Sequence, residues 1–136
     1  MWALASACFA ALTAIFAKVG VEQINPDAAT LIRTLVILAV LTALVLATGQ
    51  IRSVTSASGR TYAFLVLSGL ATGASWVCYF RALSLGDASR VAPLDKLSVV
   101  LVALFGVLFL SERLSVVNWL GVALIGMGAW LVTLRL

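Results

Sequence analysis

Residues 97–132, LSVVLVALFGVLFLSERLSVVNWLGVALIGMGAWLV, hold two long apolar runs separated only by the polar turn SERLS. They belong to apolar segments at about 91–110 and 115–134, each near the roughly 20 residues that an α-helix needs to cross about 30 Å of hydrocarbon. A connection this short predicts that the two helices are antiparallel neighbours. The stretch therefore predicts an all-α integral membrane protein, with the lipid bilayer as its solvent.

The composition of the 136-residue chain indicates the same class along its whole length. The chain is 63% hydrophobic and 10% charged, with a mean hydropathy of +1.17, whereas soluble domains are roughly 45–50% apolar and about 25% charged. Its polar surface is too small to cover a water-soluble globule of this size. We predict one transmembrane domain over residues 1–136, a five-helix bundle with helices at about 2–21, 29–48, 61–81, 91–110 and 115–134.

The charged residues and the cysteines argue against several other classes of protein. The net charge of +4 comes from basic residues spaced singly along the chain, without the interleaved aromatic residues of a nucleic-acid-binding patch. Cys8 and Cys78 lie far apart inside apolar runs, which is neither a metal-ligand spacing nor a disulfide framework. The chain has no histidine, the commonest general base and metal ligand. We therefore predict no nucleic-acid partner, no metal, no cofactor and no enzymatic activity, since Asp95 with Ser98 is the only local candidate for a base and nucleophile.

Glycines mark the faces on which these helices are expected to pack. Gly69 and Gly73 form a GxxxG motif in the third predicted helix, and Gly121, Gly126 and Gly128 lie in the fifth. In lipid, small residues allow the close backbone approach that holds helices together. We expect these glycines to serve tight packing inside the bundle rather than ligand binding.

The balance of basic residues predicts no preferred orientation in the membrane. Five helices place the two termini on opposite sides. The basic residues of loops and helix ends are then Arg52, Arg60 and Arg113 on the side of the N-terminus, and Lys18, Arg81, Arg90 and Arg135 on the other. Because an excess of Lys and Arg on one side normally fixes orientation, a chain this balanced is predicted to insert both ways. Counting the deeper Arg33 and Lys96 would instead favour an outside N-terminus, so both alternatives stay open.

The fourth predicted helix carries charges inside its apolar run. A helix over residues 97–110 alone would be about 21 Å long, which is too short to cross the hydrocarbon. The span must therefore reach back to about residue 91, so that Pro93, Asp95 and Lys96 lie within the membrane. Pro93 lacks an amide proton and disfavours helix at the residue before it, so we expect the start of this helix to be bent or partly unwound.

These charges need partners. Asp95 and Lys96 point about 100° apart on a helix, so we do not expect them to form an ion pair with each other. An unpaired charge near the middle of the bilayer costs at least about 2.5–3.5 kcal/mol. Their partners must come from other helices, from water or from a ligand, and Arg33 and Arg81 are the cations expected to meet Asp95.

Two interpretations of these charges stay open. In the functional one, Asp95 and Lys96 line a polar pathway together with Arg33, and Trp76 and Tyr79 supply aromatic walls. In the structural one, Asp95 complements the positive N-terminal dipole of its helix and Lys96 extends to the lipid headgroups. We favour the functional interpretation, because an aspartate side chain is too short to reach far and a proline lies beside it.

Several motifs, in this order, resemble the EamA-type domain of the drug/metabolite transporter superfamily over essentially the whole chain. They are LIRTLVILAVL with Arg33, YFRALSLGDAS closing the third helix, LFLSERLS and NWLGVALIGMGAWLV. The resemblance implies a carrier of small organic solutes, and a ten-helix fold in which two such domains form an inverted repeat. The chain departs from the family in having one copy, in carrying Asp95 and Lys96 where relatives are mostly apolar or proline-containing, and in having Ser111 where glycine is common.

An inverted repeat needs two five-helix units in opposite orientations, which a single-copy chain supplies by forming an antiparallel homodimer. We therefore predict a secondary transporter of metabolites, amino acids or drugs that works by alternating access as a dual-topology homodimer in a prokaryotic inner membrane. Asp95 is the candidate for a protonatable coupling group or a ligand for a cationic moiety, and Lys96 and Arg33 suit a carboxylate or phosphate. The alternative is a non-transporting membrane subunit that pairs with a different five-helix chain.

Overall fold

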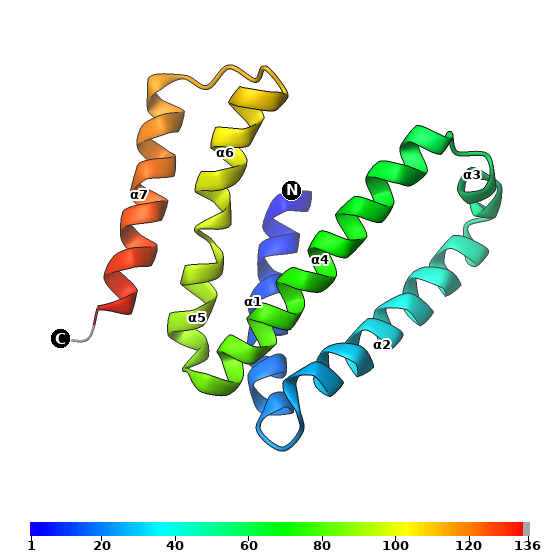
Figure 1. Ribbon diagram of the computed structural model, residues 1–136, viewed down its shortest axis with the longest axis horizontal. Coiled ribbons are helices and arrows are strands. Elements are labelled where there is room, and N and C mark those ends of the chain that lie inside the picture. The colour runs from blue at the N-terminus through cyan, green and yellow to red at the C-terminus, as the bar shows by residue number, and fades with distance from the viewer. Residues whose placement is uncertain (135–136) are drawn as a thin grey trace. The chain divides into compact units, whose positions relative to one another are not determined.

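The computed structural model describes residues 1–134, and this part of the chain is built from helices and their connections (Figure 1). In chain order the helices are α1 (Trp2–Val21), α2 (Pro26–Ala47), α3 (Ile51–Thr55), α4 (Gly59–Leu85), α5 (Ala88–Asp95), α6 (Ser98–Phe109) and α7 (Val116–Thr133). The segments long and apolar enough to cross a membrane are α1, α2, α4, α7 and Ala88–Phe109, which comprises α5 and α6. The prediction of an all-α protein with five membrane-spanning segments is confirmed. Arg135, counted above among the basic residues, lies outside the described residues.

Local signals explain where the helices differ from the predicted ranges. α2 begins at Pro26 rather than at about 29, because Asn25 is its N-cap and the Asn25 side chain accepts a hydrogen bond from the amide of Asp27 at 2.8 Å. Proline at the first helical position loses only an amide that would have no partner in the helix. α4 continues past 81 to Leu85, just before Gly86. The connection between α2 and α4 contains the short helix α3.

The described residues divide into two compact units. The first contains residues 1–15 and the residues from Gly86 onward, and the second contains residues 16–85, so that α1 contributes to both. In the first unit α7 packs against α5 and α6, and in the second unit α2 packs against α4. Figure 1 shows α2 and α4 running in opposite directions, with α3 joining them at one end.

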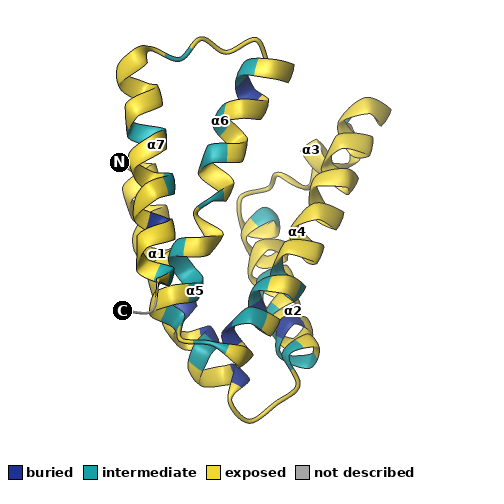
Figure 2. Cartoon of the chain, turned by 60° about the vertical axis from the view of Figure 1, so that its left-hand side comes forward, coloured by how far each residue is buried: buried dark blue, intermediate teal, exposed yellow. Residues whose placement is uncertain are grey.

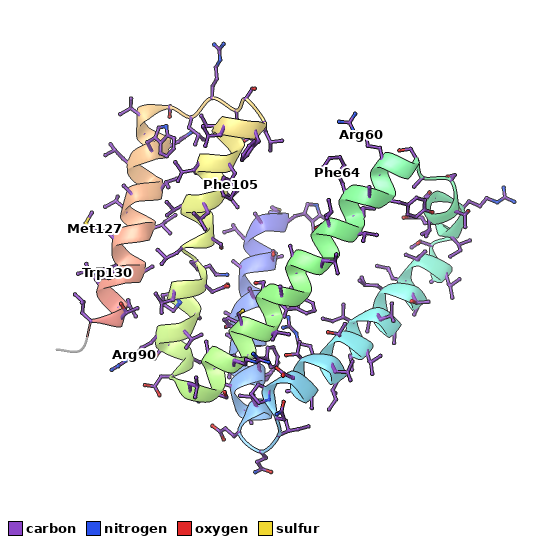
Figure 3. All side chains as sticks on the ribbon, viewed as in Figure 1. Arg60, Phe64, Arg90, Phe105, Met127 and Trp130 are labelled. Carbon is purple, nitrogen blue, oxygen red and sulfur yellow. The ribbon has the colours of Figure 1, made fainter. Side chains whose placement is uncertain are left out.

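Most apolar side chains along the spans are exposed (Figure 2). Leu38 on α2, Phe64 on α4 and Trp130 on α7 are each more than half exposed, and Figure 3 shows Met127 and Trp130 projecting from α7 on the side away from α6. The few buried apolar side chains of the second unit lie toward one end of its helices, namely Ala17, Val21, Phe80 and Leu83. This pattern is typical of helices whose outer faces are solvated by lipid rather than water.

Two glycines make close contacts inside the first unit. At Gly126 of α7, a Cβ atom would lie 3.3 Å from Val100 Cγ2 of α6. At Gly106, which is buried in α6, a Cβ atom would lie 2.7 Å from Glu112 Oε2. Among the described residues of its own unit, a Cβ atom at each of the other glycines expected to pack would meet nothing within 4 Å: Gly69, Gly73, Gly121 and Gly128.

The expectation of packing within the bundle is therefore met at Gly126 but not, within either unit, at the other four positions. Rotation around the helix explains the difference on α7. Positions 126 and 128 differ by about 200° around the axis, so only one of them faces α6. The pattern of small residues does not by itself say which face a neighbouring helix covers.

The turn between α6 and α7 uses a backbone conformation that favours glycine. Ser111 has a φ of 56°, which is uncommon for a residue with a Cβ atom. The amide of Glu112 donates to the carbonyl of Gly106 at 3.0 Å, and the Ser115 side chain caps α7. This backbone conformation would suit glycine, the residue that the family resemblance implies at the position of Ser111.

The α6–α7 contact predicts a difference between two glycines on one helix. Gly126→Leu is expected to lower the thermal unfolding midpoint in detergent, because the new side chain meets Val100, and overpacking of this kind costs about 1–3 kcal/mol. Gly128→Leu is the matched control and is expected to leave the midpoint unchanged, because its Cβ atom points into open space. Equal losses in the two variants would contradict the described packing.

Candidate functional site

The apolar segment Ala88–Phe109 is interrupted near its middle. α5 ends at Asp95 and α6 begins at Ser98. Across this break, amides donate to the carbonyl three residues earlier instead of four, at 3.0 Å each: those of Lys96, Leu97, Val99 and Val100. Such a tight 3₁₀ segment inside a long helix often marks a hinge. Irregular backbone at membrane depth is tolerated only beside protein or water.

The break lies after Pro93, not before it. α5 begins at Ala88 and stays helical through Pro93, so the expected distortion at the start of the span is wrong. A proline φ is compatible with a helix, and Pro93 removes only one amide from the hydrogen-bonding ladder. The amide of Lys96 then donates to the carbonyl of Pro93 at 3.0 Å, which begins the 3₁₀ segment.

Asp95 and Lys96 form an ion pair at this break. Lys96 Nζ lies 3.4 Å from Asp95 Oδ2. The expectation that they do not pair is wrong, because Asp95 is the last residue of α5 and Lys96 is its C-cap, so the two do not share a continuous helix. Their side chains remain 38% and 55% exposed, respectively. The pair is therefore long for a charge-assisted hydrogen bond and open to a third group.

Arg33 lies against aromatic rings in the second unit. Its guanidinium carbon is 4.2 Å from the ring centroid of Trp76 and 5.5 Å from that of Phe80, both on α4. Phe80 is buried, and Tyr79 packs edge-on against it with ring centroids 6.4 Å apart. We call Arg33, Trp76, Tyr79 and Phe80 the arginine cluster. It brings together three of the predicted site residues, and Phe80, which was not predicted, supplies a second aromatic face for the cation.

Arg81 is held by an acid of its own unit. Its Nε donates to Asp27 Oδ1 at 3.0 Å and its Nη2 to Asp27 Oδ2 at 2.8 Å. This two-bond geometry uses both carboxylate oxygens and is the strongest form of an arginine–carboxylate pair. Arg81 was expected to meet Asp95, whereas the partner that the structure gives it is Asp27. The sequence carried a signal for this pair, because Asp27 begins one span and Arg81 nears the end of the next, on the same side of the membrane.

Lys18 was counted only as a loop charge, yet it joins two helices of the second unit. Its Nζ donates to the carbonyl of Leu83, near the end of α4, at 2.9 Å. Within residues 1–134, no group of three or more His, Cys, Asp and Glu side chains is arranged to hold a metal ion.

Comparison with known proteins assigns the chain to a family. The sequence profile of the EamA-like transporter family matches residues 1–134. The chain belongs to the EamA-like transporter family. A Sinorhizobium sp. protein named "Uncharacterized transporter in cobO 3'region" is 70% identical over 130 residues, which cover 96% of this chain and 92% of that relative. No solved structure matches the chain significantly.

The resemblance to the EamA-type domain of the drug/metabolite transporter superfamily is thus confirmed. Together with the five apolar spans, the EamA-like family and the name of the relative support an integral membrane protein with a transporter role, and they point away from enzymatic activity. In this EamA-like chain the predicted pathway residues fall into two groups. Asp95 and Lys96 lie at the break in the first unit, and the arginine cluster lies between α2 and α4 of the second.

Proposed function

We propose that the protein is a secondary transporter of small organic solutes. The observation that carries the proposal is the interrupted fourth span, with the charged pair Asp95 and Lys96 at the interruption, in a chain of a transporter family. In secondary transporters, discontinuous helices offer helix ends and backbone groups at which solutes and coupling ions bind near the middle of the bilayer. Ionisable side chains retained inside a span are costly, which is why they are commonly functional.

Two antiparallel copies form the transporter in this proposal. An odd number of spans and balanced loop charges allow the same chain to insert in both orientations. The open space at Gly69 and Gly73, the GxxxG pair of α4, leaves a small-residue surface for a second copy. Each charged pair then occurs twice around an axis in the membrane plane. Rocking one copy against the other exposes the solute to alternate sides. The membrane is a bacterial inner membrane in this proposal, because the similar relative is bacterial.

Flux measured in proteoliposomes tests the proposal. The purified chain is reconstituted, and uptake of labelled amino acids, organic acids and amines is followed with and without a pH gradient. We expect at least one solute to enter faster than into protein-free liposomes and to exchange against the same solute inside. The alternative, a non-transporting subunit, predicts no flux for any solute and co-purification with a different five-helix chain from the native membrane.

A further inference from the structure

We infer that the transported solute carries a carboxylate and that Arg33 binds it. This inference rests on the proposed transport function and names the chemical class of the solute. The depth of Arg33, the charges of α2 and α4 and the contacts of the arginine cluster support it.

Arg33 lies well inside its span. It is seven residues beyond Pro26, so it lies about 10 Å along the helix axis from the start of α2. Its guanidinium rests over Trp76, which is five residues, or about 7.5 Å, further into α4 than Arg81. Arg81 and Asp27 mark the level of the helix ends. The cation of Arg33 is therefore held on the inner side of that ion pair instead of extending to the headgroups.

Neither α2, which carries Arg33, nor α4, which packs against α2, has a carboxylate that could pair with Arg33. Asp27 is the only acidic residue in the sequences of α2 and α4, and both of its oxygens bind Arg81. Within the described second unit, Arg33 contacts aromatic rings and makes no ion pair. Within that unit one positive charge is left without an anion at membrane depth, where an ionisable side chain is costly. A bound anion would remove this cost.

The chemistry of Arg33 and its aromatic surroundings suits a carboxylate. The guanidinium carbon lies over the rings of Trp76 and Phe80, which accept no N–H···O hydrogen bond, so the planar fork of N–H donors on Arg33 is available to a ligand. That edge matches the two oxygens of a carboxylate, which accept parallel hydrogen bonds. A single cation is neutralised by a monoanion, whereas a phosphate dianion would leave an uncompensated negative charge. A lipid phosphodiester is also a monoanion, so the experiment must separate the two sources.

Matched pairs of probes test the inference. The thermal unfolding midpoint is measured in nanodiscs of phosphatidylcholine with benzoate against benzamide, isovalerate against isovaleramide, and glutamate against glutamine. We expect at least one carboxylate to raise the midpoint and its amide to leave it unchanged. Arg33→Gln is expected to weaken binding of that carboxylate at least tenfold. Arg33→Lys, which keeps the charge but loses the planar fork, is expected to bind with intermediate affinity.

Arg60→Gln is the matched control. Arg60 also lies on α4 within 5.9 Å of an aromatic ring, that of Phe64, but at the far end of the helix (Figure 3). Carboxylate binding is expected to be the same in this variant as in the unmodified protein. Each variant is first compared without ligand, so that a general loss of folding is recognised. If Arg33→Gln does not fold, the comparison of Arg33→Lys with the unmodified protein decides.

Three outcomes would overturn the inference. The first is that no carboxylate binds better than its amide, and the second is that Arg33→Gln or Arg33→Lys binds as tightly as the unmodified protein. The third is stabilisation by phosphatidylglycerol alone, which would assign Arg33 to a lipid headgroup. Flux in the same preparation separates this inference from the proposed function. If a solute is transported but no carboxylate binds, the carboxylate inference is wrong and the transport proposal stands. If a carboxylate binds through Arg33 but no solute is transported, the transport proposal is wrong and the carboxylate site stands.

Discussion

Replacing Asp95 by asparagine is expected to reduce solute flux in proteoliposomes about 100-fold. The amide keeps the shape of the side chain but removes the charge that faces Lys96 Nζ at 3.4 Å. Lys96 is then left without its counter-charge at the break between α5 and α6. In the functional interpretation this carboxylate binds a coupling proton or a cationic group of the solute; a hydrogen bond to a charged group contributes about 1.5–3 kcal/mol, and about 1.4 kcal/mol corresponds to a factor of ten. The initial rate of uptake is the measurement.

Asp87→Asn is the matched control for this variant. Asp87 also faces a basic residue, with its Oδ2 3.9 Å from Arg90 Nε, but it precedes the first turn of α5 and its side chain is 74% exposed. We expect flux in Asp87→Asn to equal that of the unmodified protein. An equal loss in both variants would show that carboxylates matter for insertion in general and not at the break.

A double variant tests whether Asp95 and Lys96 act in transport or only cancel each other's charge. Asp95→Asn combined with Lys96→Gln removes both charges, so neither is left unpaired in the bilayer. The functional interpretation expects this protein to insert and fold but to transport as poorly as the single variant. Recovery of flux would mean that the pair only cancels its own charge, as in the structural interpretation of the two residues.

Shifting the loop charges is expected to separate the two orientations of the chain. Ser53→Lys with Ser56→Lys adds positive charge on the side of the N-terminus, and Glu22→Lys with Gln23→Lys adds it on the other side. Each pair is expected to fix one orientation, because the side richer in Lys and Arg stays in the cytoplasm. Either variant alone is expected to lose flux to the background level. Co-expression of the two is expected to restore it, since together they supply both orientations.

Labelling measures the orientation directly. Cys8 and Cys78, which are both free, are first replaced by serine, and a single cysteine is placed at Ser56. In the chain with unmodified loop charges, an impermeant reagent should reach this cysteine from both faces of the membrane. Labelling from one face only, with flux intact, would refute the antiparallel pair and favour either a parallel assembly or a different partner chain.

The spans were predictable because their signal is long and repeated, but their ends depend on single contacts. The start of α2 depends on the cap at Asn25, which lies outside the apolar run that defined the predicted range. The break in the fourth span was placed too early, because Pro93 signals a missing amide but not how the following residues rearrange. The packing at Gly126 depends on helix rotation, which the glycine pattern leaves open.

The candidate site was partly predictable for a related reason. Residue type and membrane depth were sufficient to select Arg33 and Trp76, which the structure brings together. They were not sufficient to pair charges, because a counter-ion is chosen by three-dimensional proximity among several acids of similar depth. Asp27 was not among the predicted site residues, although it is the residue that binds Arg81.

The pairing of Asp27 with Arg81 has a consequence for how the chain is made. The ribosome completes α2 long before it reaches Arg81, 54 residues after the acid that will bind it. Until then, the carboxylate lacks the partner that it has in the complete chain. We therefore expect α2 to stay beside the insertion machinery until α4 emerges, so that the two spans are released into the bilayer together rather than one at a time.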